Sequence, residues 1–375
     1  MTSVDLSTTG GAVKSGEGLA QWTRVLCVLF FFSGFPALIY QLIWERALFL
    51  VFGVNIESVT IVVTAFMLGL GFGSLAGGWL SRWREVSPLL LLAAIEFLTG
   101  AFGFVSLHIF HEVGDLIIGL SLPATAVVSL ALVILPTLLM GATLPLLVSH
   151  VVRRSGNTGG AIGLLYYVNT LGAGAACLVS AVALFPFLGM SGSIYVAVTF
   201  NSVVALCALA FYWQDRRRAL PAAPVSMPKV RTIALGLPLA CLFAAAGGYV
   251  SLSYEIFFFR TESFASGSSA TAFAVTLSAF LVGIASGARE AGERCESATR
   301  AEIARGLVDA LLKAALVGLV FLPLLNRLAW LDRGMLGAVI IMVYLVARYW
   351  GALLPCLAEF SVPPDDRAGT RTAAL

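Results

Sequence analysis

Ten long apolar runs constrain the fold of this chain more than any other feature of its sequence. Each has about 18 residues or more, roughly the length that an α-helix needs to cross the hydrocarbon core of a bilayer. Lipid offers no partner for backbone N–H and C=O groups, so each run is expected to form a helix. The sequence therefore predicts an all-α polytopic membrane protein with about ten spans, near residues 22–44, 58–80, 88–107, 122–150, 161–186, 191–213, 232–258, 270–288, 306–325 and 335–357.

The low charge content agrees with this prediction. The chain of 375 residues is 59% hydrophobic and 11% charged, whereas soluble domains carry roughly a quarter charged residues. Its 6 cysteines form no CxxC pair, so the sequence predicts neither a disulfide framework nor a zinc site. No motif in the sequence predicts a catalytic residue, a cofactor, another metal or a nucleic-acid partner.

The distribution of basic residues predicts the orientation of the chain. With a cytoplasmic N-terminus, the far more numerous basic residues of the other loops fall on the inner side, and the outer loops carry only Arg46, Arg260, Arg327 and Arg333. Cytoplasmic loops are enriched in Lys and Arg. We therefore expect both termini to lie in the cytoplasm.

Five segments follow from the spans and their connections. We expect a disordered cytoplasmic tail (1–21), a first six-helix membrane bundle (22–213), a basic, proline-rich cytoplasmic linker (214–231), a second four-helix membrane repeat (232–357) and a cytoplasmic tail (358–375).

An internal repeat relates the two bundles. A shift of 214 residues aligns Tyr40 with Tyr254 and Gly73 with Gly287, and a shift of 210 aligns GATLPLL at 141–147 with GALLPCL. Spans 1–4 therefore resemble spans 7–10. Because the repeats lie six spans apart, both enter the membrane in the same direction, as the parallel repeats of major-facilitator transporters do. The expected fold is therefore major-facilitator-like, with an incomplete second repeat. Formation of a homodimer is one way to complete the bundle.

The second span carries one face of small residues. Gly69, Gly73 and Gly77 recur every four residues, which places them on the same side of a helix. Such faces let the backbones of two membrane helices approach closely. We interpret these glycines as a helix-packing face; no strand precedes them, so a nucleotide-binding glycine loop is disfavoured.

Several sequence blocks resemble the membrane region of fused spermidine-synthase-like bacterial proteins. They are SGFPALIYQLIWERALFLVFG, AFMLGLGFGSLAGGWLSR, AIEFLTG, LPTLLMGATLPLL and LLYYVNTLGAGAA. The resemblance implies a major-facilitator-like region in a bacterial inner membrane, but the soluble synthase domain of the family is missing from this chain. It therefore does not carry over synthase activity; it implies a transporter-like protein for a small polar or cationic solute, such as a polyamine.

Charged groups inside spans are costly and are candidates for a site. Glu96 lies in the middle of span 3, and a loose repeat alignment places Asp309 at a similar depth. Facing one another, the two carboxylates would suit a cationic solute or a proton relay. The structural alternative is that Glu96 joins helices through hydrogen bonds and that Asp309 pairs with Lys313 one turn on. Asn169 in span 5 is a further candidate for a cavity or for an interhelical hydrogen bond.

A second polar group recurs near the outer ends of spans 1 and 7. Its members are Tyr40, Gln41 and Arg46 in span 1 and Tyr254, Glu255 and Arg260 in span 7. An interfacial belt of aromatic and basic residues would explain them. The shared Tyr-x5-Arg spacing favours instead a common constraint, either the entrance to a solute cavity or a clamp between the two halves.

Two further functions stay open at this stage. The chain is alternatively a membrane scaffold for a separate cytoplasmic aminopropyltransferase-like enzyme, since the C-terminus is expected on that side. A membrane enzyme would need a nucleophile, a metal centre or a paired acid and base, and the sequence offers no convincing set. The partners expected are the lipid bilayer, a small solute, a cytoplasmic enzyme or a second copy of the chain.

Overall fold

The computed structural model describes residues 7–52, 56–83, 86–116, 121–218, 234–265, 270–328, 332–365 and 367–375. Every regular element in these ranges is helical. The elements are α1 (Ser7–Phe52), α2 (Ile56–Leu80), α3 (Pro88–Leu116), α4 (Leu122–Ser155), α5 (Thr158–Val179), the π-helical η1 (Ser180–Leu184), α6 (Phe185–Arg218), α7 (Leu237–Ala265), α8 (Ala270–Ser297), α9 (Arg300–Leu328), α10 (Asp332–Gly351), α11 (Leu353–Ser361) and α12 (Ala368–Ala374).

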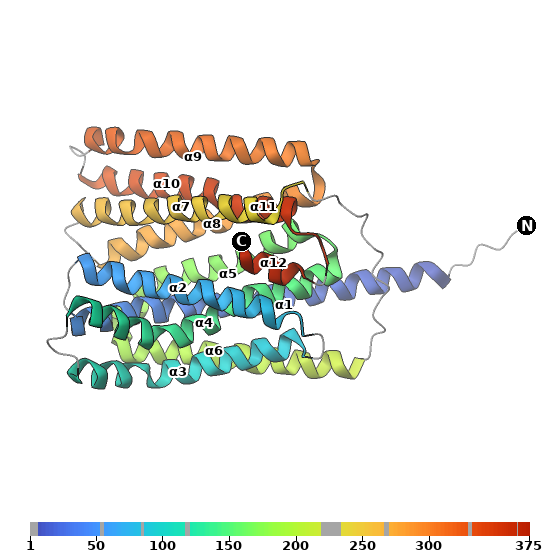
Figure 1. Ribbon diagram of the computed structural model, residues 1–375, viewed down its shortest axis with the longest axis horizontal. Coiled ribbons are helices and arrows are strands. Elements are labelled where there is room, and N and C mark those ends of the chain that lie inside the picture. Colours follow the sequence, from blue (N-terminus) through green and yellow to red (C-terminus); the bar gives the residue numbers. More distant parts are fainter. Residues whose placement is uncertain are drawn as a thin grey trace, which may run out of the picture.

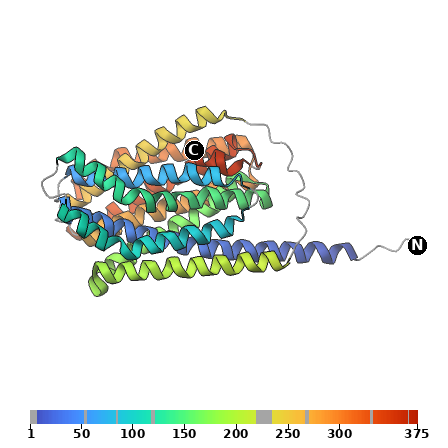
Figure 2. The same ribbon diagram turned by 60° about the horizontal axis from the view of Figure 1, so that its bottom comes forward.

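The long helices form one bundle. Figure 1 shows α9 and α10 at one edge and α3 and α6 at the other, with α5 and α8 between them. The first turns of α1 project beyond the neighbouring helices, which is also visible in Figure 2. We call the end of the bundle where α2, α6 and α8 finish the Arg-rich end, because Arg82, Arg216 and Arg294 lie there.

Within the described residues, seven stretches are long and apolar enough to cross a membrane. They are Trp22–Leu48, Val63–Leu80, Pro88–Gly114, Val127–Arg153, Thr158–Gln214, Leu237–Phe258 and Gly337–Ser361. The fifth contains both α5 and α6, and the chain leaves helical geometry inside it at Gly189 (φ 65°, ψ −169°). The chain is a multi-pass membrane protein, but the expected count of ten spans is not confirmed: α8 and α9 carry charged residues and are not in this set.

The expected N-terminal tail and the expected linker both differ in part from the structure. Residues 7–21 belong to α1, which therefore begins well before the first apolar run. No proline precedes Pro36 in this helix, so no proline interrupts the N-terminal extension. Residues 1–6 lie outside the described residues. The linker expected at 214–231 begins within α6, which continues to Arg218, and residues 219–231 also lie outside the described part.

The C-terminal segment is folded rather than a free tail. Thr370 donates a hydrogen bond from its hydroxyl to the Gly78 carbonyl (2.7 Å) and accepts one from Arg82 Nε (3.0 Å). The residues Ala368, Gly369, Thr372 and Ala373 are buried, against the ends of α2 and α4. Small side chains allow this close fit, which hydropathy alone does not reveal.

The repeat seen in the sequence corresponds to repeated contacts. Gly73 lies so close to α4 that a Cβ there would be 2.2 Å from the Leu138 carbonyl oxygen. In the second half, a Cβ on Gly287 would be 1.8 Å from the carbonyl oxygen of Arg348, in α10. Gly69 and Gly77 face α4 in the same way. The small-residue face of α2 is therefore a helix-packing surface, and α8 repeats it.

The two halves meet along α5 and α8. A Cβ on Gly163 would lie 2.5 Å from the Cα of Gly292, so the two backbones nearly touch. Farther along, the Ser278 hydroxyl donates to the Gly174 carbonyl (2.8 Å), and the Cys177 thiol donates to the Ala274 carbonyl (3.2 Å). Close backbone approach gives this boundary extensive van der Waals contact.

The start of α9 is capped reciprocally. The Glu302 carboxylate accepts from the backbone N–H of Thr299 (2.8 Å), and the Glu302 N–H donates to the Thr299 hydroxyl (3.4 Å). This is a capping box, which satisfies N–H groups that the helix leaves unpaired. The bond from the Thr299 N–H, followed by the bond from its hydroxyl, lowers the pKa of Glu302 below its usual range.

This cap should respond to acid. A lowered pKa means that the stabilisation is fully present above the unfolded value, about 4.3, and is lost as the pH falls through the folded value. We expect hydrogen exchange at the first turn of α9 to accelerate below about pH 4.3, relative to the intrinsic rate. In Glu302→Gln this acceleration of hydrogen exchange at low pH should be absent. The same acceleration in the variant would contradict the role of the Glu302 carboxylate in the cap.

Candidate functional site

A buried polar network lies inside the first half, between α1, α3 and α6. The Glu96 carboxylate accepts hydrogen bonds from the Ser33 hydroxyl and from Asn201 Nδ2 (2.6 Å for the latter). Tyr40 donates from its hydroxyl to Asn201 Oδ1 (2.9 Å). Glu96 is 3% exposed and Tyr40 is 0% exposed. Each carboxylate oxygen of Glu96 accepts a hydrogen bond from a neighbouring helix, one from α1 and the other from α6. These contacts favour a structural role for Glu96 over direct contact with a solute.

The aromatic residues near the end of α1 are core residues. The rings of Tyr40 and Trp44 stack at 4.9 Å, and neither residue is exposed. The Trp44 indole N–H donates to the Ser106 hydroxyl (2.9 Å), and a Cβ on Gly103 would meet the Tyr40 ring at 2.5 Å. The interfacial belt is therefore the wrong explanation for Tyr40, because the ring packs inward against α3.

The second half repeats this packing. Tyr254 and Phe258 stack at 5.6 Å, one helical turn apart like Tyr40 and Trp44. A Cβ on Gly318 in α9 would lie 2.2 Å from the Tyr254 hydroxyl oxygen. The shared tyrosine therefore packs the first helix of each repeat against the third helix of the same half. These contacts do not form the expected clamp between the two halves. The side chain of Arg260 lies outside the described residues.

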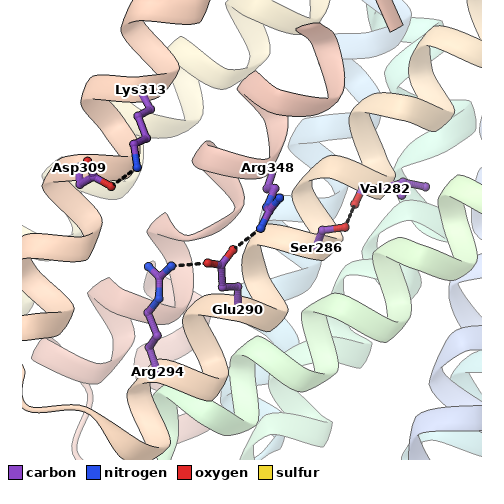
Figure 3. A network of polar contacts seen from close by, with 7 residues as sticks. All are labelled: Val282, Ser286, Glu290, Arg294, Asp309, Lys313 and Arg348. Atoms are coloured by element: carbon purple, nitrogen blue, oxygen red, sulfur yellow. Dashed lines mark hydrogen bonds and ion pairs between the residues drawn. The ribbon is translucent and has the colours of Figure 1, made fainter. Parts of the chain in front are cut away.

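Asp309 does not face Glu96. Its side chain is 61% exposed and pairs with Lys313 Nζ at 2.6 Å, one turn along α9 (Figure 3). Glu96 lies on α3, at the opposite edge of the bundle (Figure 1). The expected pair of carboxylates is wrong, because the outward face of α9 carries Asp309 and the structural alternative, the ion pair with Lys313, is formed.

Asn169 and Arg46 have well-defined neighbours. A Cβ on Gly34 would lie 2.2 Å from the Asn169 carbonyl oxygen and 2.8 Å from its side-chain oxygen, so α1 and α5 approach closely there. The Arg46 guanidinium carbon lies 4.8 Å from the ring centroid of Phe185, a cation–π contact. Asn169 therefore lies at the contact between α1 and α5, and Arg46 lies against Phe185.

A different pair of carboxylates spans the boundary between the halves. Glu45 on α1 and Glu255 on α7 lie near enough to interact electrostatically, and both are partly buried. Cys177 of α5 is within electrostatic range of both, and Tyr166 of α5 is within range of Glu255. Gln41 lies one turn before Glu45 and is also partly buried. We call Glu45, Glu255, Tyr166 and Cys177 the boundary acidic site.

Sequence reasoning identified half of this site. It selected Glu255 as a candidate site residue, but it did not select Glu45 as its partner. The missed signal is the four-residue spacing of Gln41 and Glu45, which places both on one face of α1. Which neighbouring helix this face of α1 meets is a tertiary property, and the spacing alone does not define it.

A charged network occupies the Arg-rich end of the second half. Glu290 of α8 accepts from Arg348 of α10 (2.9 Å) and pairs with Arg294 one turn along its own helix (Figure 3). Side chains here are 40–44% exposed, so solvent weakens each ion pair. The network joins α8 to α10.

No protein-family model matches this chain, and no curated protein matches it. Among solved structures, it is similar to the major facilitator superfamily proton:xylose symporter XylE bound to 6-bromo-6-deoxy-D-glucose. The identity is 13% and the TM-score 0.56, and the alignment covers 95% of this chain and 85% of the symporter.

Two POT family transporters also align. PepTSo has 18% identity over 81% of this chain and 60% of its own length, and an auto-inhibited peptide transporter has 16% identity over 92% and 85%. Both have TM-scores of 0.39, too low to support a fold assignment. The fold therefore rests on the symporter: this chain has a major-facilitator-like membrane fold.

Proposed function

We propose that this chain is a transporter-like membrane protein that handles a small polar or cationic solute. The observation that carries the proposal is the major-facilitator-like fold. Within it, Glu45 and Glu255 come from different halves and lie within electrostatic range of one another. Ionisable groups within a membrane bundle mark solute or proton pathways more often than they mark inert packing.

The chemistry of the site favours a cation. Two carboxylates that face one another repel when both are ionised, and a bound cation or a shared proton removes this repulsion. Because Glu45 belongs to α1 of the first half and Glu255 to α7 of the second, the strength of their interaction depends on the separation of the two halves. Such a dependence is what a solute site in an alternating-access protein requires.

A polyamine is the first solute to test. It is a linear polycation, which fits two carboxylates, and the resemblance to fused spermidine-synthase-like proteins implies it. The same resemblance and the excess of basic residues at one end lead us to propose a bacterial inner membrane with that end in the cytoplasm.

Binding should depend on both boundary carboxylates. In proteoliposomes, we expect Glu45→Gln and Glu255→Gln each to reduce uptake or binding of spermidine by at least about tenfold, the effect of losing roughly 1.4 kcal/mol. Glu293→Gln is the matched control, since Glu293 is exposed and pairs only locally with Arg289. The melting temperature verifies that each variant is folded.

A panel of other solutes tests the choice of substrate separately from the choice of site. If wild-type protein binds neither polyamines nor any of a set of small cationic and polar metabolites, the solute class is wrong. If a folded Glu45→Gln, Glu255→Gln double variant transports as well as wild type, the boundary acidic site is not the transport site.

A further inference from the structure

Two cysteines from different helices meet near the Arg-rich end of the second half. Cys295 lies in the last turns of α8 and Cys356 lies in α11. The Cys295 thiol donates a hydrogen bond to the backbone carbonyl of Pro355 (3.9 Å), the residue directly before Cys356. Cys295 is 0% exposed and Cys356 is 4% exposed. Both belong to one apolar cluster, together with Ala291, Ile303 and Ala352. Two buried thiols in one packed cluster, one of them bonded to the residue beside the other, are well placed for covalent linkage.

The pair sits directly beside the start of α5. Asn157 Nδ2 donates to the Cys295 carbonyl (3.1 Å), and a Cβ on Gly159 would lie 2.9 Å from the Cys295 sulfur. Glu359, one turn after Cys356, accepts from the Gly159 N–H (3.3 Å). The two thiols therefore lie where α8 and α11 of the second half hold the N-terminus of α5 of the first.

A small pocket opens one turn along α11 from Cys356. Thr158, Arg300 and Glu359 contribute to its lining. The sulfur atoms themselves are buried, so a reagent reaches them when α11 moves away from α8. Reaction of this pair is therefore expected to depend on local opening at the Arg-rich end.

We propose that Cys295 and Cys356 form a redox-reactive dithiol that closes to a disulfide and ties α11 to α8. The oxidant is a low-molecular-weight disulfide. One cysteine loses its proton, and its thiolate attacks a sulfur of the oxidant, giving a mixed disulfide and releasing one thiolate. The second cysteine then loses its proton and attacks the protein sulfur, which forms the S–S bond and releases the second thiolate.

The electrons and protons balance across these steps. The two cysteines are oxidised by two electrons and lose two protons, and the small disulfide is reduced to two thiols. In a reducing cytoplasm such a bond is transient, which is typical of redox-sensing pairs rather than of permanent disulfides. The inference does not depend on transport, since it concerns only the contact between α8 and α11.

The test is a redox titration of the full-length protein in detergent. The purified chain is equilibrated with glutathione and glutathione disulfide at increasing ratios, trapped with acid and alkylated, and then mapped by mass spectrometry. We expect a Cys295–Cys356 cross-linked peptide to accumulate before any other pair among the 6 cysteines. The melting temperature of the oxidised protein should rise by a few degrees, because the cross-link restricts the unfolded chain.

The variants sharpen this test. Cys207→Ala is the matched control, because Cys207 lies in α6, outside the cluster that holds Cys295 and Cys356, and it should leave the cross-link intact. Cys356→Ser should abolish both the cross-link and the temperature shift. The proposal is overturned if the folded wild-type protein forms no such cross-link at the highest disulfide ratio, or if the cross-link forms only after denaturation.

Discussion

Leucine in place of Gly73 should lower the melting temperature of the solubilised protein by many degrees, whereas leucine in place of Gly71 should not. A Cβ at position 73 would lie 2.2 Å from the Leu138 carbonyl oxygen, but nothing lies within 4 Å of a Cβ at position 71. The obstacle at Gly73 is backbone, so α2 and α4 must separate. Overpacking a core costs about 1–3 kcal/mol, and we expect Gly73→Leu at or above the top of that range.

The second half offers an independent test of the same contact. Gly287→Leu should be as destabilising as Gly73→Leu, because a Cβ there would lie 1.8 Å from the Arg348 carbonyl oxygen. Gly248→Leu is its control, with open space around the position. Thermal unfolding in one detergent compares all four variants. Equal stability of Gly73→Leu and Gly71→Leu would contradict the packing of α2 against α4.

Leucine in place of Asn201 should cause the second large loss of stability. Asn201 donates to Glu96 and accepts from Tyr40, and all three residues are buried. The substitution leaves a buried carboxylate with one donor fewer and a buried phenol without this acceptor. Unsatisfied buried groups cost about 1–3 kcal/mol each and more for a charge, so we expect a loss of about 2–5 kcal/mol.

The neighbouring position provides the control for Asn201. Ser202 is exposed, and its hydroxyl donates only to the Val198 carbonyl of its own helix, so Ser202→Leu should be nearly neutral. Chemical or thermal unfolding measures both. A loss of stability in Ser202→Leu equal to that in Asn201→Leu would show that α6 tolerates no leucine here, and the network would lose its support.

Glu96→Gln distinguishes the two roles of this carboxylate. If the network is structural, the variant should keep spermidine binding unchanged while its stability falls. If Glu96 contacts the solute, binding should fall in a variant that remains folded. The outcome for Glu45→Gln, measured in the same liposomes, shows whether the boundary acidic site and the Glu96 network act separately.

Local sequence features predicted much of the scaffold. Apolar run length predicted membrane helices, because lipid leaves the backbone no other way to satisfy its hydrogen bonds. The four-residue spacing of Gly69, Gly73 and Gly77 predicted a packing face, and the repeat predicted that Gly287 would have a similar environment. These features are encoded within a few turns of one helix, so a single sequence reveals them.

The site was less predictable, and particular residues show why. Tyr40 has the composition and place of an interfacial residue, yet α3 covers it; Asp309 has the depth of a site residue, yet it faces outward. Glu45 becomes a candidate site residue only because the fold brings it within electrostatic range of Glu255, which is 210 residues away in the sequence. Hydropathy measures how deep a residue lies, but not which neighbour its side of the helix meets.

The sequence by itself determined that this protein is a bundle of membrane helices with a repeated pattern of tight glycine contacts. Only the tertiary structure decided which groups come together. Glu96 bonds to Asn201, Glu45 lies within electrostatic range of Glu255, and Cys295 and Cys356 share one buried cluster. The physical reason is that helix formation depends on local backbone hydrogen bonds, whereas these meetings depend on the rotation and register of helices that are far apart along the chain.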